Sequence, residues 1–124
     1  MKSTYFDEYD LLELFNAEPE MIGSDEAGLY MYSKTNSNGV QILLLLSVHE
    51  NKCRISLSIE ETTFFKVELN NVENLHRKDG WLRIRQSSGE NDFFICFYPI
   101  FYVTTGDTQP LVPTLIFHDE LKGY

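Results

Sequence analysis

Cysteine is scarce in this sequence, and no apolar segment is long. Two cysteines, Cys53 and Cys96, occur among 124 residues, too few for the disulfide framework of a small secreted scaffold. Each lies in a strand-like apolar run, so we predict two buried free thiols. The longest apolar run, residues 40–48, is far shorter than the roughly 20 residues that span a bilayer. No export signal is visible at the start of the chain, and we expect a cytoplasmic protein that does not bind membranes.

The sequence motifs of enzymes and metal sites are also missing. His49, His76 and His118 fall in segments that we predict to be turns, and none has a second histidine or a cysteine at metal-ligand spacing. There is no glycine-rich phosphate loop and no GxSxG nucleophile elbow. Most acids lie in polar stretches, whereas carboxylates that transfer protons as a pair need shared burial. We therefore predict no catalytic residue, no cofactor and no metal.

Basic residues are outnumbered, and the acids are concentrated at one end. Ten Lys and Arg stand against nineteen Asp and Glu, which gives a net charge of −9. Residues 1–26 hold eight acids and one base, Lys2, and so carry −7 of that charge. A negative surface repels phosphate backbones, so we expect no nucleic-acid partner, and it attracts basic proteins. Acidity of this kind also serves solubility, which is an alternative explanation.

Apolar and aromatic residues, by contrast, are plentiful. Hydrophobic residues make up 43% of the chain and aromatic residues 14%, well above the content of disordered chains. A chain of this length, split in two, would leave pieces too small for a self-sufficient core. We therefore predict one folded domain over residues 1–124.

The N-terminal segment has the pattern of a helix over about residues 7–16. Its apolar residues recur at helical spacing, and Asp7 is placed to cap the first turn. A stretch with Pro, Gly and four acids follows over about 17–27 and predicts an acidic loop. The apolar stripe of the helix consists of Tyr9, Leu11, Leu12, Leu14 and Phe15.

From residue 28 to about 118 the apolar pattern changes to a period of two, which is typical of antiparallel strands. An Asn-Gly turn at Asn38 and Gly39 joins a first strand to a central strand that we expect to be covered on both faces. The polar segment 70–80 predicts an exposed turn. Pro99 predicts either a bend or an edge position in the apolar run 93–103, and a last strand is predicted over 111–117. The fold expected is a β-dominated α+β domain with six to eight mostly antiparallel strands, a sandwich or curved sheet, and a short N-terminal helix.

Trp81, Arg83 and Arg85 alternate with apolar residues along one predicted strand. Such a face could bind anions or stack on bases. Because the chain is acidic, a wet sheet face or a contact with a protein is the better interpretation.

Three stretches of the sequence carry a resemblance to a known family. They are the end of the predicted helix, Leu14–Pro19, the segment Phe64–Leu75 and the aromatic strand Phe93–Tyr102. Together with the apolar strands between them, they resemble the β-rich immunity proteins encoded beside bacterial polymorphic toxins and contact-dependent growth-inhibition toxins. The resemblance covers most of the chain. It implies a cytoplasmic protein that binds a cognate toxin domain, frequently a nuclease, and neutralises it by occlusion without chemistry of its own.

Under this resemblance, the acidic end of the chain is the candidate partner-binding surface. A nuclease is expected to be basic where it holds phosphates, and an acidic inhibitor could compete for that surface and associate quickly. The candidate contacts are Asp7, Glu8, Asp10, Glu13, Glu18, Glu20, Asp25 and Glu26.

Two other functions fit the same residues. An adaptor or chaperone of a bacterial secretion system would share the size, the acidity and the lack of catalytic groups. A small-ligand-binding β-sandwich is the other alternative, since the sixteen Phe and Tyr residues could line an apolar pocket as well as fill a core.

Overall fold

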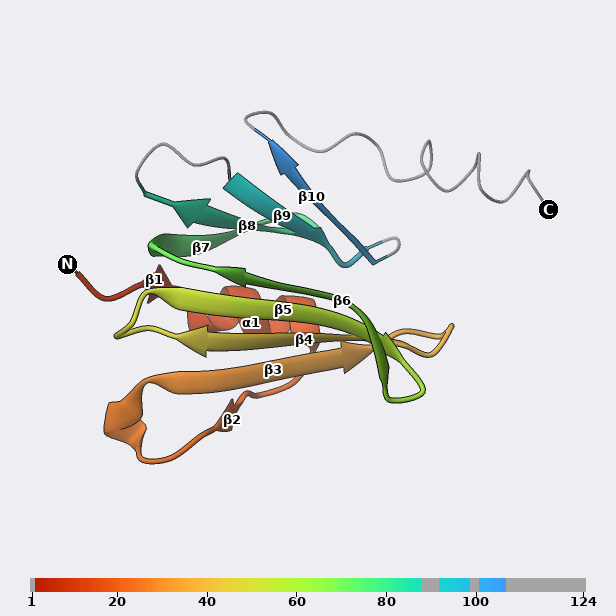
Figure 1. Cartoon of the computed structure of the whole chain (residues 1–124), viewed down its shortest axis with the longest axis horizontal. Helices are drawn as coiled ribbons and strands as arrows, with labels where there is room; N and C mark the ends of the chain where they lie inside the picture. The colour runs from red at the N-terminus through yellow and green to blue at the C-terminus, as the bar shows by residue number, and fades with distance from the viewer. Residues whose placement is uncertain (1, 88–91, 99–100, 107–124) are drawn as a thin grey trace.

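Two five-stranded sheets and one short α-helix form the part of the chain that the computed structural model describes, residues 2–87, 92–98 and 101–106 (Figure 1). Sheet A has the strand order β1-β7-β8-β9-β10 and sheet B the order β2-β3-β4-β5-β6. Neighbouring strands are antiparallel except for β1 and β7. The elements are β1 (Tyr5–Phe6), α1 (Glu8–Phe15), β2 (Glu20–Met21), the 3-10 helix η1 (Asp25–Ala27), β3 (Leu29–Thr35), β4 (Val40–Ser47), β5 (Lys52–Ile59), β6 (Thr62–Leu69), β7 (Val72–Lys78), β8 (Trp81–Gln86), β9 (Asp92–Cys96) and β10 (Tyr102–Gly106).

The α1 helix lies where the sequence predicted it, and its ends have the expected chemistry. Asp7 is the N-cap, and its Oδ1 accepts a hydrogen bond of 2.8 Å from the backbone N–H of Tyr9. Asn16 ends the helix in the left-handed conformation, with φ of 55°. The predicted stripe was wrong at Tyr9, which is 77% exposed. The helix residues that enter the core are Leu11, Leu14 and Phe15.

The four long strands of sheet B form an antiparallel meander with β4 at its centre. The predicted turn before β4 is confirmed: the Asn36 side chain accepts hydrogen bonds from the N–H groups of Asn38 and Val40, and Gly39 has φ of 82°. We expected cover on both faces of β4. Its inward residues are buried, but Leu43 and Leu45 on the other face are only half-buried, because no layer of the described chain lies over them.

One prediction was wrong in sheet A, that of an exposed turn over residues 70–80. The polar segment 70–80, expected to be an exposed turn, contains the seven-residue strand β7, and His76 lies in that strand. Val72 and Leu75 are buried although they are three residues apart. A register shift between Val72 and Asn74 allows this, because a bulge moves the alternation of the strand by one position. The turn itself is confined to Asp79 and Gly80.

The apolar run 93–103 contributes residues to two strands, β9 and β10. β9 and β10 pair antiparallel, with Tyr102 opposite Cys96, so the chain reverses between them. Pro99, the predicted last strand 111–117 and His118 lie outside the described residues.

A single cluster of buried residues fills the space between the sheets. Sheet B contributes the inward residues of β4 and β5, sheet A those of β7, β8 and β9, and α1 lies against both layers. Phe15 shows this position directly, because its ring packs against Tyr32 of β3 at 5.2 Å between ring centroids and against Phe97, just after β9, at 4.8 Å. The predicted β-dominated α+β fold with a short N-terminal helix is therefore confirmed as a two-sheet sandwich. The described residues form ten strands instead of the six to eight predicted, and β1 and β2 have only two residues each, too few to show a pattern.

Cys53 and Cys96 are buried thiols that form no disulfide, as predicted. Burial raises the pKa of the Cys53 thiol well above its ordinary value, so this thiol stays protonated and unreactive at neutral pH.

The β6 strand is one edge of sheet B. Its inward residues, such as Phe65 and Val67, are half-buried, whereas Lys66 and Glu68 on the other face are exposed. Its pairing with β5 shifts register between Leu57 and Ser58.

Candidate functional site

The predicted acidic loop over 17–27 contains more regular structure than expected. β2 pairs with β3, with Glu20 opposite Met31 and Met21 opposite Tyr30, and η1 follows. Gly23 and Gly28, which lie on either side of η1, have φ of 78° and 67° and turn the chain. The pairing holds the acidic segment against β3 and beside α1.

Two of the eight predicted contact residues have internal roles. Asp7 caps α1, and Asp10 accepts a long hydrogen bond, 3.4 Å, from the backbone N–H of Arg77 on β7. Both are half-buried. Asp25 lies in η1. The predicted contacts with exposed side chains are Glu8, Glu13, Glu18, Glu20 and Glu26.

A groove of about 330 Å³ lies between α1, β2 and β3. It brings together two of the predicted acids, Glu8 from the first turn of α1 and Glu18 from the connection to β2. Tyrosines that were not predicted as site residues line the same groove. We call this surface the acidic groove. Its lining residues are Glu8, Tyr9, Leu12, Glu18, Pro19, Met21, Tyr30 and Tyr32.

Tyr32 forms the floor of the acidic groove. Its side chain is 1% exposed, and its ring packs on Phe15. Burial raises the pKa of the Tyr32 hydroxyl to about 12, and the negative charges of Glu8 and Glu18 add to this effect. The hydroxyl therefore stays neutral and lies within electrostatic reach of both carboxylates.

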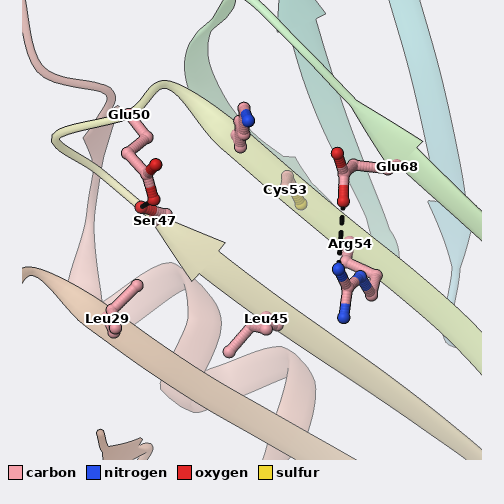
Figure 2. Close-up of a pocket in the computed structure, with 8 residues that line it drawn as sticks. Leu29, Leu45, Ser47, Glu50, Cys53, Arg54 and Glu68 are labelled. Carbon is pink, nitrogen blue, oxygen red and sulfur yellow. Dashed lines mark hydrogen bonds and ion pairs between the residues drawn. The ribbon is translucent and has the colours of Figure 1, made fainter. Parts of the chain in front are cut away.

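A second hollow, of about 200 Å³, lies over the outer face of sheet B (Figure 2). Three of its four charged residues already have partners: Arg54 pairs with Glu68 at 3.1 Å, and Ser47 Oγ donates to Glu50 at 2.9 Å. Both hollows mix charged and apolar residues. Neither is the continuous apolar pocket that a small-ligand-binding sandwich would need.

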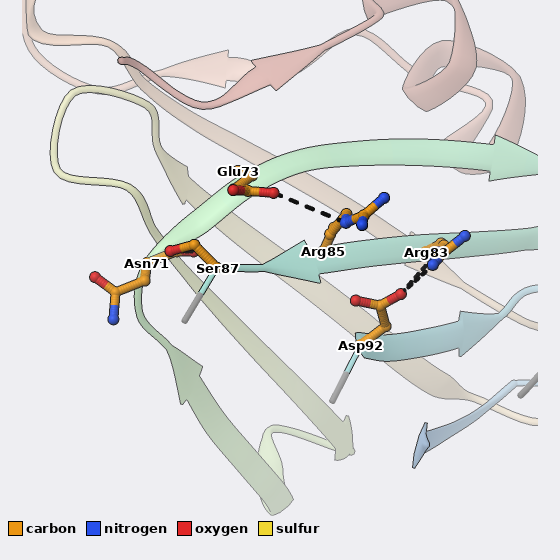
Figure 3. Close-up of polar contacts among 6 residues, drawn as sticks. All are labelled: Asn71, Glu73, Arg83, Arg85, Ser87 and Asp92. Carbon is orange, nitrogen blue, oxygen red and sulfur yellow. Dashed lines mark hydrogen bonds and ion pairs between the residues drawn. The ribbon is translucent and has the colours of Figure 1, made fainter. Parts of the chain in front are cut away.

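The arginine-bearing face of β8 is an ion-paired surface (Figure 3). Arg83 pairs with Asp92 of β9, and Arg85 lies 3.8 Å from Glu73 of β7. The Trp81 ring meets Tyr102 edge to face at 5.1 Å. Because carboxylates face both guanidinium groups, this surface offers little free positive charge to an anion.

Within residues 2–87, 92–98 and 101–106, no three side chains of His, Cys, Asp or Glu come together as a metal site requires. Over the same ranges no helix has the length and apolar character of a membrane span.

No protein-family model matches the chain, and no curated protein matches it. A solved structure does: a chain of the contact-dependent growth inhibition toxin – immunity protein complex from Klebsiella pneumoniae 342. The match has a TM-score of 0.73 and 17% sequence identity, and it covers 86% of this chain and 98% of the other. At this identity the match shows a shared fold that extends over nearly the whole of the other chain.

Proposed function

We propose that this protein is an immunity protein that binds a cognate toxin domain in the cytoplasm and neutralises it by occlusion. The observation that carries the proposal is the shared fold with a chain of a toxin–immunity complex. The three stretches that resemble β-rich immunity proteins support it independently of the fold.

Charge favours the role of inhibitor over that of toxin. A toxin domain that cleaves nucleic acid has to hold phosphates and needs basic residues for this, whereas this chain has a net charge of −9. The acids at its N-terminal end would instead match a basic partner surface. Such complementarity speeds the encounter of two proteins and makes its rate depend on salt.

The contact surface we propose consists of the acids of residues 7–26, with the exposed glutamates as its main part. Occlusion needs no chemistry from this chain, and no catalytic residue is assigned. Asp7 and Asp10 would contribute negative charge to this surface while they also serve the fold.

Co-expression tests the proposal. The chain is produced with the toxin-like domain encoded immediately upstream of its gene, and both co-elution and survival of the cells are scored. A stable complex that protects the cells is the expected result. Absence of a complex would contradict the proposal, and a complex without protection would favour the adaptor or chaperone function.

Charge reversal locates the contact surface. In Glu18→Lys/Glu20→Lys, association with the toxin domain is expected to slow by about tenfold at low salt and to depend less on salt, because electrostatic steering is reduced. The matched control is Glu60→Lys/Glu61→Lys, two exposed acids in the turn between β5 and β6. Equal slowing of both variants, measured by stopped flow, would show an effect of net charge and remove this surface as the site.

A further inference from the structure

The acidic groove combines three chemical features within one hollow. Glu8 and Glu18 supply carboxylates, Tyr9 and Tyr30 supply aromatic rings, and Tyr32 supplies a hydroxyl at the floor. Tyr9 is 77% exposed, and Tyr30 is fixed by an edge-to-face contact with Phe6 at 5.2 Å. The Tyr9 ring is therefore open to a ligand at the surface, and the Tyr30 ring is half-buried at the edge of the core.

No Lys or Arg among the described residues forms an ion pair with the carboxylates of the acidic groove. Ion pairs among the described residues join Arg54, Arg83 and Arg85 to acids elsewhere on the two sheets. Lys34, two residues beyond Tyr32 on β3, donates its Nζ to the Leu14 carbonyl at 3.0 Å, at the end of α1. The negative charge of the groove is thus uncompensated within the part of the chain that the structure describes.

The Tyr32 hydroxyl gives a second indication that is independent of charge. A tyrosine hydroxyl in a buried position usually has a hydrogen-bond partner, yet no described residue hydrogen-bonds to this one although the side chain is 1% exposed. No side-chain polar atom of the described residues is both fully buried and unpaired, so the hydroxyl reaches the space of the groove. There it can accept a hydrogen bond from a ligand.

From these features we infer that the acidic groove receives an arginine side chain presented by a protein partner, which deepens the proposed function and rests on it. A guanidinium group can stack on a tyrosine ring while its N–H groups donate to carboxylate and hydroxyl oxygens. The aliphatic part of the side chain would lie along Leu12 and Met21. A metal ion fits poorly because the groove offers two carboxylates, and an anion is repelled by them.

A peptide titration tests the recognition itself. The probe is acetyl-Gly-Arg-Gly-amide, followed by two-dimensional amide NMR of the full chain at millimolar concentrations, and the control probe contains citrulline, the neutral analogue of arginine. Saturable shifts at Glu8, Glu18, Tyr30 and Tyr32 with the arginine peptide alone are expected. Absence of these shifts, or equal shifts with citrulline, would overturn the inference.

Matched variants separate the groove from the general acidity. Glu8→Gln/Glu18→Gln removes the carboxylates of the groove, and Glu13→Gln/Glu20→Gln removes two exposed acids of the same segment outside its lining. The first variant is expected to bind the arginine peptide about tenfold more weakly and the second to change little. A thermal unfolding curve for each variant confirms that both remain folded.

The same two variants, measured against the toxin domain, distinguish failure of this inference from failure of the proposed function. Greater weakening of the complex by Glu8→Gln/Glu18→Gln than by Glu13→Gln/Glu20→Gln supports both. A complex that is equally affected by the two variants overturns the inference and leaves the proposed function intact. Peptide binding in the groove with no toxin complex contradicts the proposed function and leaves arginine recognition standing.

Discussion

Asp7 contributes to the fold through one hydrogen bond at the start of α1. Replacing it with alanine leaves an N–H of the first turn without its acceptor, and we expect a loss of about 1 kcal/mol in the free energy of unfolding. Urea denaturation measures this change. Asp7→Asn is the control, because asparagine caps equally well. Equal losses in the two variants would show that the charge of Asp7 matters and its cap does not.

The raised pKa of the Tyr32 hydroxyl predicts that the protein loses stability at alkaline pH. Its hydroxyl has a pKa of about 12 in the folded protein and an ordinary value of 10.0, so the folded state keeps a proton that the unfolded state releases between these values. Its contribution is therefore present below pH 10 and is lost as the pH rises toward 12. Tyr32→Phe should show a smaller decline of the unfolding free energy over this interval.

Part of the decline in the unfolding free energy remains in Tyr32→Phe. It comes from Tyr102, whose pKa is also raised to about 12, and from Cys53, whose pKa is raised by burial. The quantity to compare is thus the difference between Tyr32→Phe and the unchanged protein. A difference that does not vary with pH would contradict the role assigned to the Tyr32 hydroxyl.

At the scale of single residues, the sequence predicted the cap and the buried cysteines but only half of the groove. Clustering of acids in residues 1–26 indicated Glu8 and Glu18 as contacts. Their meeting with Tyr30 and Tyr32 depends on the pairing of β2 with β3, and β2 has two residues, too few to show a periodic pattern. Tyr30 and Tyr32 look like ordinary residues of the β3 strand, because nothing in the sequence shows that β2 pairs beside them.

β7 supplies the prediction at the scale of one element. Leu75 is 2% exposed and lies opposite Ile84 of β8, so Leu75→Ala should lower the free energy of unfolding by about 2–5 kcal/mol. The neighbouring His76 is exposed, and His76→Ala should change it by less than about 0.5 kcal/mol. Similar small effects of both substitutions in urea denaturation would mean that this segment is the exposed turn first predicted.

Elements with regular alternation were predictable, and those with interrupted alternation were not. β3, β4, β5, β6 and β8 show clear patterns of apolar residues, and they lie within the segment, residue 28 to about 118, over which the sequence predicted antiparallel strands. β7 was missed because its bulge places its two buried residues three apart and because polar side chains fill the positions between them. Its strand character comes from backbone pairing with β8, which no local pattern reveals.

The two sheets share one core, and for the whole molecule this predicts a single unfolding transition. Trp81 is the one tryptophan and reports on sheet A, and Cys53 reports on sheet B. In a Cys96→Ala variant, Trp81 fluorescence and the reactivity of the Cys53 thiol should give the same urea midpoint. Different midpoints would mean that the sheets unfold separately and would contradict the prediction of one domain over residues 1–124.

The edge strand β6 bears on how this protein behaves in the unbound state. A long, flat and apolar edge would invite another copy to add a strand and begin an aggregate. Lys66 and Glu68 place charges on β6, and the register shift opposite it twists the edge. Under the proposed function, an unbound pool would therefore accumulate without forming fibres and would be available to bind the toxin domain as soon as that domain is made.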